Sequence, residues 1–155
     1  MRILLLALSL LLAACGPSGR LELVAEGLNT PFGVAFDAED NMYVVEYKGN
    51  RVLKAAPGGK LEPFAGTGEP SFGGDGGPAI EAGLHEPHSI AILPGNLFIA
   101  DTRNHRIRVV DLETSTIDTL AGTGERARSP EGAAGKAAHL NGPFSVDARD
   151  GNLYV

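Results

Sequence analysis

The sequence predicts an all-β fold built from a repeated unit of four short strands. The 155 residues include 21 Gly and 10 Pro, and the apolar segments between these turn formers are only a few residues long. The same motifs also return at a constant spacing, which sets the architecture before any local structure is considered. With 43% hydrophobic and 21% charged residues, the chain has enough apolar surface to bury a core and is not of the disordered class.

The charge balance and the cysteine count exclude several further classes. A net charge of -6 argues against a polyanionic partner, so no nucleic-acid partner is expected. The three arginines within residues 103–108 are expected to lie on a solvated strand edge. The single cysteine can neither close an intramolecular disulfide nor supply a Cys-rich zinc site.

The repeat has a period of 56 residues. The segment LNTPFGV at residues 28–34 returns as LHEPHSI at 84–90 and as LNGPFSV at 140–146. The segment AGTGE at residues 65–69 recurs unchanged at 121–125. Repeats therefore start near residues 28, 84 and 140.

Each unit contains four strands separated by turn residues. In the first unit, Val34 and Phe36 alternate on one face, and an Asp/Asn turn at residues 37–41 follows. Residues 42–45 are apolar throughout, and a Gly-Asn turn precedes the next strand. The predicted strands are 33–36, 42–45, 51–53 and 61–65.

Strands that are apolar on both faces must be covered on both faces, which a single meander facing water cannot achieve. Radial stacking of four-stranded blades covers both faces, and each blade needs its neighbours to do so. The alternative is a linear β-solenoid, but its rungs are shorter than 56 residues. The sequence therefore predicts a β-propeller over residues 21–155, of which about two and a third blades are present.

Specific motifs then resemble a known family. PFGVAFD from residue 31 and NLFIADTRNHRIRV at residues 96–109 are similar to NHL repeats, whose family fold is a β-propeller. The insert FGGDGGPA at residues 72–79 resembles the GDGGPA connection of bacterial secreted NHL proteins. The resemblance covers residues 28–155 and implies the fold, whereas propellers host many unrelated functions.

The number of repeats predicts that more blades exist elsewhere. Propellers close with four to eight blades, and Val155 aligns with the middle of the second strand of a third unit. We expect an N-terminal fragment of a longer parent whose remaining blades complete the ring. The alternative is a short protein whose chains self-associate into a ring.

The first residues have the pattern of an export signal. Arg2 precedes the apolar segment 3–12, which is too short to span a bilayer. Residues 12–16 (LAACG) resemble a bacterial lipobox, which implies a signal peptide at 1–14, a lipidated Cys15 and a short tether at 15–20. The predicted location is the bacterial cell envelope, and Gly16 resembles the outer-membrane sorting signal of Gram-negative bacteria. The alternatives are a plain signal peptide with an incidental cysteine and a buried cysteine.

Acid and base pairs recur at matched turn positions. Glu46 precedes Arg51 by five residues, and Asp101 precedes Arg106 by the same interval, with Asn104 between them. Because the pattern repeats in both complete units, we expect these residues to bridge strands or blades and to satisfy turn N–H groups. Their predicted role is structural.

The residue after each repeat proline is the candidate ligand contact. His88 aligns with Phe32 and Phe144, where the innermost strand of a blade begins at the mouth of the central channel. In NHL-like lyases that cleave peptidyl-hydroxyglycine, a Pro-His-Gly segment here supplies a zinc ligand, so the resemblance makes His88 a candidate metal ligand. Phenylalanine cannot ligate a metal. No metal site or cofactor is therefore predicted in this chain, and zinc or calcium would need a full-length parent. Asp75 in the insert is a further candidate ligand contact.

Two functions follow from this pattern. The first is an envelope-anchored propeller that acts as a binding or scaffold module for a protein, peptide or glycan, with no catalytic residue assigned. The second is an enzyme with a channel-mouth site, of the metal-dependent lyase or lactone hydrolase type. No nucleophile elbow is present, since Glu69 stands where a glycine is required.

Overall fold

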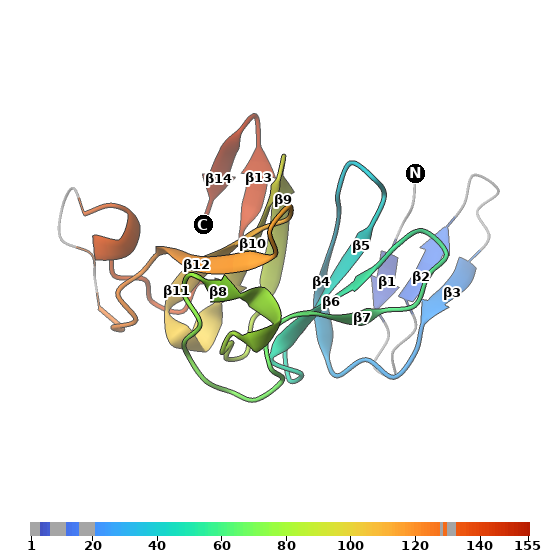
Figure 1. Ribbon diagram of the computed structural model, residues 1–155, viewed down its shortest axis with the longest axis horizontal. Helices are drawn as coiled ribbons and strands as arrows, with labels where there is room; N and C mark the ends of the chain where they lie inside the picture. The colour runs from blue at the N-terminus through green and yellow to red at the C-terminus, as the bar shows by residue number, and fades with distance from the viewer. Residues whose placement is uncertain (1–3, 7–11, 16–20, 128, 130–132) are drawn as a thin grey trace.

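The computed structural model describes residues 4–6, 12–15, 21–127, 129 and 133–155. Within them the chain forms antiparallel strands in four sheets, joined by turns and three short 3₁₀ helices. Figure 1 shows two larger sheets in the middle of the molecule, with a small sheet at each end of the chain. The all-β fold with four-stranded blades is confirmed, and the third blade is present in part.

Blade 1 is a four-stranded sheet in sequence order. Its central strand β5 is buried at every position, as expected of a strand that is apolar on both faces. Tyr43 and Val45 point into the core shared with blade 2, whereas Met42 and Val44 belong to a second cluster with Leu28. The strands are β4 (Pro31–Phe36), β5 (Met42–Glu46), β6 (Arg51–Ala55) and β7 (Glu62–Ala65).

The β4–β5 turn forms because Asp37 replaces missing backbone partners. Its Oδ1 accepts hydrogen bonds from the backbone N–H groups of Glu39 and Asn41, at 3.1 and 2.9 Å. Its Oδ2 accepts from the Asn41 amide and from the Tyr43 hydroxyl. This carboxylate therefore fixes the turn and satisfies the polar end of a buried tyrosine.

Blade 2 contains one strand more than the repeat predicts. The insert that follows blade 1 returns to pair with the outer strand of blade 2, so the sheet order is β8-β12-β11-β10-β9. The 3₁₀ helix η1 (Ala79–Glu81) follows β8 directly, and η2 (Thr102–Asn104) follows β10. The strands are β8 (Gly77–Pro78), β9 (Ser89–Leu93), β10 (Asn96–Asp101), β11 (Arg106–Asp111) and β12 (Thr116–Ala121).

Blade 3 is represented by its first two strands. These are β13 (Asp147–Arg149) and β14 (Asn152–Tyr154), preceded by η3 (Gly135–Ala137) in the second insert. The chain next to β13 bonds to β9 of blade 2, since the Ser89 hydroxyl and the backbone of Val146 lie 3.3 Å apart. Val146 packs with Ala91, Ala100 and Ile107 in a small core between the two blades.

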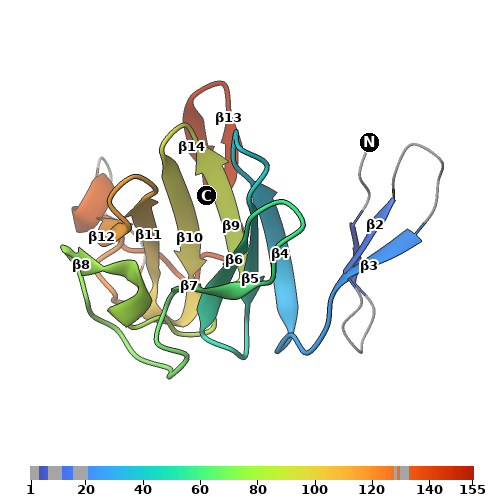
Figure 2. The same cartoon turned by 45° about the vertical axis from the view of Figure 1, so that its right-hand side comes forward.

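The main core lies between blades 1 and 2. Figure 2 shows their inner strands β4 and β9 next to each other. Side chains from both sheets and from the insert fill this space, including Val45, Leu84 and Ile99, which have no exposed area. A blade therefore buries its faces against its neighbour, which is the physical reason for the radial repeat.

The first glycine of each AGTGE segment stands where the backbone leaves no room for a side chain. Gly66 has φ +92° and Gly122 has φ +102°, a region that side chains rarely occupy. A Cβ on Gly66 would lie 2.5 Å from the Asn50 carbonyl oxygen, and one on Gly122 would meet the His105 carbonyl oxygen. The sharp turn into each insert thus passes directly over the preceding β-turn.

The first strands form a separate sheet, set apart from the blades in Figure 2. It contains β1 (Leu4–Leu6), β2 (Leu12–Cys15) and β3 (Leu21–Ala25). Cys15 is the last residue of β2, while the rest of the expected tether, residues 16–20, lies outside the described residues. Signal removal and lipidation stay predictions. Among the described residues, no helix has the length and apolar character needed to cross a membrane.

Candidate functional site

The residues that follow the three repeat prolines lie together. The rings of Phe32 and His88 have centroids 4.2 Å apart, and those of His88 and Phe144 are 4.9 Å apart. We call Phe32, His88 and Phe144 the aromatic row. Phe32 is 47% exposed and Phe144 is 61% exposed, which is high for large apolar side chains. Three blades thus contribute one ring each to a continuous, accessible surface.

Hydrogen bonding fixes the orientation of His88. Its Nδ1 lies 3.0 Å from the carbonyl oxygen of Phe144, and a carbonyl can only accept, so Nδ1 carries the proton. The ring is packed between Phe32 and Phe144, and Tyr47 adds an edge contact at 5.9 Å. Within the part of the chain that the structure describes, no group of three or more His, Cys, Asp or Glu is placed to hold a metal.

A charged group adjoins the row through Tyr47. The ring centroids of Tyr47 and Phe32 are 5.3 Å apart, and the Tyr47 hydroxyl donates to Glu86 at 2.7 Å. The same carboxylate accepts from Lys48 at 2.5 Å and from Arg103 at 2.8 Å. These hydrogen bonds, led by the one from Lys48, lower the pKa of Glu86 to about 2. Glu86 is therefore ionised at any physiological pH.

At each of the two blade junctions, a turn side chain of one blade accepts a hydrogen bond from a backbone N–H at the start of the next blade. Asn50 and His105 occupy matched turn positions and both have left-handed backbones, with φ of 50° and 52°. Asn50 Oδ1 accepts from the N–H of Glu86 at 2.9 Å, and His105 Nδ1 accepts from the N–H of Gly142 at 3.0 Å. Burial, together with the guanidinium groups around it, keeps the pKa of His105 below its usual 6.5, which favours the neutral ring that this contact needs.

The first acid and base pair lies where the sequence places it. Glu46 has no exposed side-chain area and accepts from Arg51 Nε at 2.5 Å across β5 and β6. Its other oxygen accepts from the backbone N–H of Asn29 at the start of the repeat. Glu46 thus joins two strands and satisfies a turn donor.

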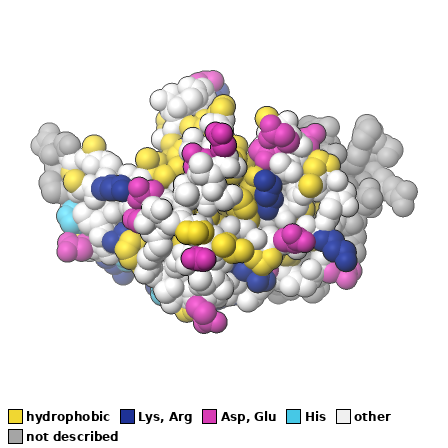
Figure 3. Space-filling model, in the orientation of Figure 1, with side chains coloured by type: hydrophobic (Ala, Val, Ile, Leu, Met, Phe, Trp, Pro, Cys, Tyr) yellow, Lys and Arg dark blue, Asp and Glu magenta, His cyan; other side chains and the backbone are white. Residues whose placement is uncertain are grey.

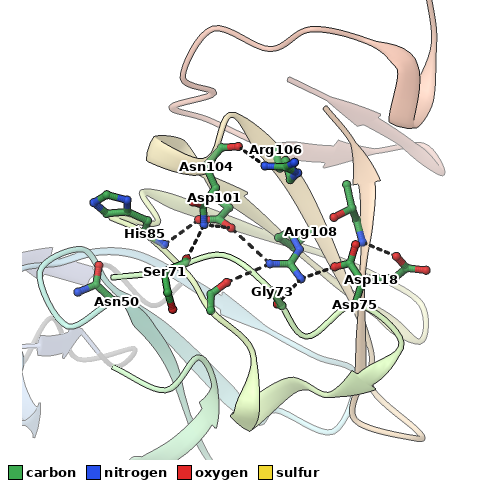
Figure 4. A network of polar contacts seen from close by, with 12 residues as sticks. Asn50, Ser71, Gly73, Asp75, His85, Asp101, Asn104, Arg106, Arg108 and Asp118 are labelled. Atoms are coloured by element: carbon green, nitrogen blue, oxygen red, sulfur yellow. Dashed lines mark hydrogen bonds and ion pairs between the residues drawn. The ribbon is translucent and has the colours of Figure 1, made fainter. Parts of the chain in front are cut away.

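In blade 2 the acid pairs with a different cation from the one predicted (Figure 4). Asp101 accepts from the N–H of His85, the counterpart of Asn29, and from the Asn104 amide. Its cation is the guanidinium of Arg108, at 3.5 Å, and not that of Arg106. Burial raises the pKa of Asp101, while the contacts from Asn104, His85 and Arg108 oppose that rise.

Arg108 is the main correction to the sequence expectation. It was expected on a solvated edge, yet it has no exposed area. Its guanidinium donates to Asp75 at 2.5 Å and to the carbonyl oxygens of Gly73 and Gly83. Asp75, expected to contact a ligand, therefore anchors the insert to β11 (Figure 4). The Nε of Arg108 has no hydrogen-bond partner among the residues that the structure describes.

Arg106 holds the inserts from the other side. It donates to the carbonyl oxygens of Asn104 and Thr123 at 2.9 and 2.7 Å. Its guanidinium also lies 3.7 Å from the centre of the Phe72 ring, a cation–π contact with the insert. Arg106 and Arg108 together clamp the Gly-rich segment to blade 2.

Comparison with known proteins identifies the repeat. Residues 84–110, from Leu84 to the penultimate residue of β11, match the NHL repeat family. NHL repeat-containing protein 2 of Bos taurus is 30% identical over 118 residues, which are 75% of this chain and 16% of that protein. This chain is an NHL-repeat protein. The insert at 72–79 lies outside the matched residues, so its family resemblance stays a prediction.

Solved structures share the fold of this NHL-repeat protein at low identity. An auxiliary nutrient binding protein from Bacteroides thetaiotaomicron superposes with a TM-score of 0.67 and 14% identity, over 90% of this chain and 38% of that one. A virginiamycin B lyase from Staphylococcus aureus superposes with a TM-score of 0.59 and 16% identity, over 94% of this chain and 41% of that one. The NHL chain thus spans about two fifths of each structure.

A groove at the outer edge of the NHL blades was not expected from the sequence. It has a volume of about 370 Å³ and lies between β7 and the insert, lined by Phe64, Pro78, Ile80 and the turn 114–116. Figure 3 shows apolar side chains gathered over β8 and η1, and Ile80 is 50% exposed. The groove does not include the aromatic row.

Proposed function

We propose that this NHL-repeat propeller is a binding module whose ligand, a protein, peptide or glycan, contacts the aromatic row. The observation that carries the proposal is the adjacency of Phe32, His88 and Phe144, one from each of three blades, with the two phenylalanine rings exposed. Exposed contiguous aromatic surface marks interaction sites, and aromatic side chains dominate the affinity of such sites. One fold neighbour is described as a nutrient binding protein, which is compatible with this role.

The test compares two phenylalanines on one strand. Phe32 and Phe36 both lie on β4, are 47% and 40% exposed, and only Phe32 belongs to the aromatic row. We expect Phe32→Ala to weaken binding to the ligand selected from an oligosaccharide and peptide array by at least about tenfold, the loss typical of a central aromatic contact. Phe36→Ala should bind like wild type. Equal losses in both variants, or none in Phe32→Ala, would place the site elsewhere.

A second candidate is an enzyme with a site at the same channel mouth, of the metal-dependent lyase or lactone hydrolase type. The position of His88 after the repeat proline favours it, as does the fold likeness to a protein named as a virginiamycin B lyase. Metal analysis of the purified protein separates the two candidates. One equivalent of zinc or calcium that disappears in His88→Ala supports the enzyme, whereas unchanged metal content in that variant supports the binding module.

We also propose that a lipid on Cys15 anchors the protein to the bacterial envelope. What supports this is the lipobox-like segment LAACG at residues 12–16. In Cys15→Ala we expect loss of fatty-acid labelling and a shift from the membrane pellet to the soluble fraction, because stable anchoring depends on acyl chains. Retention of the variant in the membrane fraction would refute the anchor.

A further inference from the structure

Two cations occupy equivalent positions beside the aromatic row. Lys48 follows β5 in blade 1 and Arg103 follows β10 in blade 2, each two residues after the buried acid of its blade. Both reach the carboxylate of Glu86, which lies between the blades. Tyr47 connects this group to the row, because its ring packs on Phe32 and its hydroxyl donates to Glu86.

This group carries an excess of positive charge on an acidic chain. Glu86 stays ionised because its pKa is about 2, so two cations face one anion, although the whole chain has a net charge of -6. Lys48 and Arg103 are also accessible, with side chains 54% and 61% exposed. An ammonium has three N–H donors and a guanidinium has five. The bonds to Glu86 use one N–H of Lys48 and one N–H of Arg103. Donors therefore remain for a ligand.

A third exposed cation lies at the next junction, at a different repeat position from Lys48 and Arg103. Arg126 donates through Nε to the side-chain oxygen of Asn141 at 2.8 Å, and Asn141 lies three residues before Phe144. This partner is a neutral amide, so the hydrogen bond itself adds no negative charge beside Arg126. Exposed positive groups thus accompany the aromatic row at both blade junctions that the structure describes.

We propose that the ligand of the aromatic row is an acidic oligosaccharide, a polyuronate, whose carboxylates bind Lys48 and Arg103. This inference rests on the proposed binding function and narrows its ligand class. A pyranose ring presents an apolar CH face that stacks on aromatic rings, while its hydroxyls stay in water at the rim. A peptide backbone laid on the same rings would need partners for its N–H and C=O groups, which the rings do not offer. Arginine is also suited to bidentate carboxylate binding.

The experiment measures binding of the whole protein to oligogalacturonate, oligoglucuronate and oligomannuronate by calorimetry. The matched probe is the methyl ester of each oligosaccharide, which keeps the sugar rings and removes the negative charge. We expect at least one polyuronate to bind, its methyl ester to bind at least about tenfold more weakly, and affinity to fall as salt rises.

Variants test the named cations. Lys48→Gln with Arg103→Gln should weaken polyuronate binding at least about tenfold and lower the preference for the polyuronate over its methyl ester. Lys136→Gln is the control, because Lys136 is also exposed and ion-paired, at 2.7 Å from Asp118, but lies on the second insert. Affinity that does not depend on ligand charge, or equal losses in the control, would overturn the proposal.

The failure of this inference is distinct from that of the proposed function. Binding of a neutral glycan or of a peptide in preference to every polyuronate, with sensitivity to Phe32→Ala, would refute the acidic ligand and retain the aromatic site. Polyuronate binding that is insensitive to Phe32→Ala would refute the aromatic site itself.

Discussion

Replacing Arg108 with methionine should lower the free energy of unfolding by about 3–5 kcal/mol, because it removes one partner of a buried ion pair and leaves the other charge uncompensated. Arg108 and Asp101 both have no exposed side-chain area. The carbonyl oxygen of Gly83 would also lose its bond from Arg108, and that of Gly73 would keep only its bond from the Gly83 N–H. Urea unfolding of the purified protein measures the effect.

Two further variants separate the buried charge from other causes. Arg149→Met removes an arginine that is 78% exposed and should change stability by no more than about 0.5 kcal/mol. Adding Asp101→Asn to Arg108→Met removes the stranded carboxylate, so the double variant should be less destabilised than the two single losses combined. A double loss that equals the sum of the single losses would contradict the ion pair.

Replacing Gly122 with alanine should destabilise the protein by about 3 kcal/mol or more. The added Cβ would meet the carbonyl oxygen of His105 and lie 2.9 Å from the Cα of Arg106, so backbone must move. The residue would also hold a φ of +102° that alanine disfavours. Thermal and urea unfolding of the variant measure this loss.

Gly95→Ala is the matched control for Gly122→Ala. Gly95 has φ +79°, and nothing lies within 4 Å of its added Cβ. Its cost should therefore be the backbone strain alone, on the order of 1 kcal/mol. If both variants lose the same stability, the close approach over the β-turn is not what selects glycine in AGTGE.

The repeat made the fold predictable, because matched segments must form matched strands. The strands of blade 1 and the pairing of Glu46 with Arg51 lie at the expected residues. The fifth strand of blade 2 was missed, since Gly77 and Pro78 have no strand propensity and form β8 only through tertiary contact with β12.

Whether the predicted residues bind a ligand stays a prediction, whereas the surface location expected for Arg108 was wrong. Aligning the repeats was sufficient to place Phe32, His88 and Phe144 at equivalent positions, although not to show their rings in contact. Arg108 was assigned to the surface from its charge. A signal was available, because its counterpart in blade 1 is Leu53, a core residue at 5% exposure. Charge patterns alone do not locate a buried arginine whose partners come from a distant insert.

The contribution of Tyr47 and Glu86 could not be predicted in this way. Glu86 aligns with Thr30 and Gly142, neither of which is charged, so the repeat gives no indication of a carboxylate there. The carboxylate of Glu86 bonds to Lys48 of another blade, which is 38 residues away in sequence. Contacts between blades follow from stacking geometry, which a single sequence does not encode locally.

The outer strands of the two complete blades bear on how the protein avoids aggregation. An unpaired strand edge is a template for sheet growth by another chain. In blade 1 the edge strand β7 carries Pro63, which has no N–H to offer. In blade 2 the proline-free β12 is capped along Thr116 and Ile117 by β8, whose last residue is Pro78. Each sheet therefore ends on a strand that contains a proline, and the insert that enlarges blade 2 also protects its edge from intermolecular pairing.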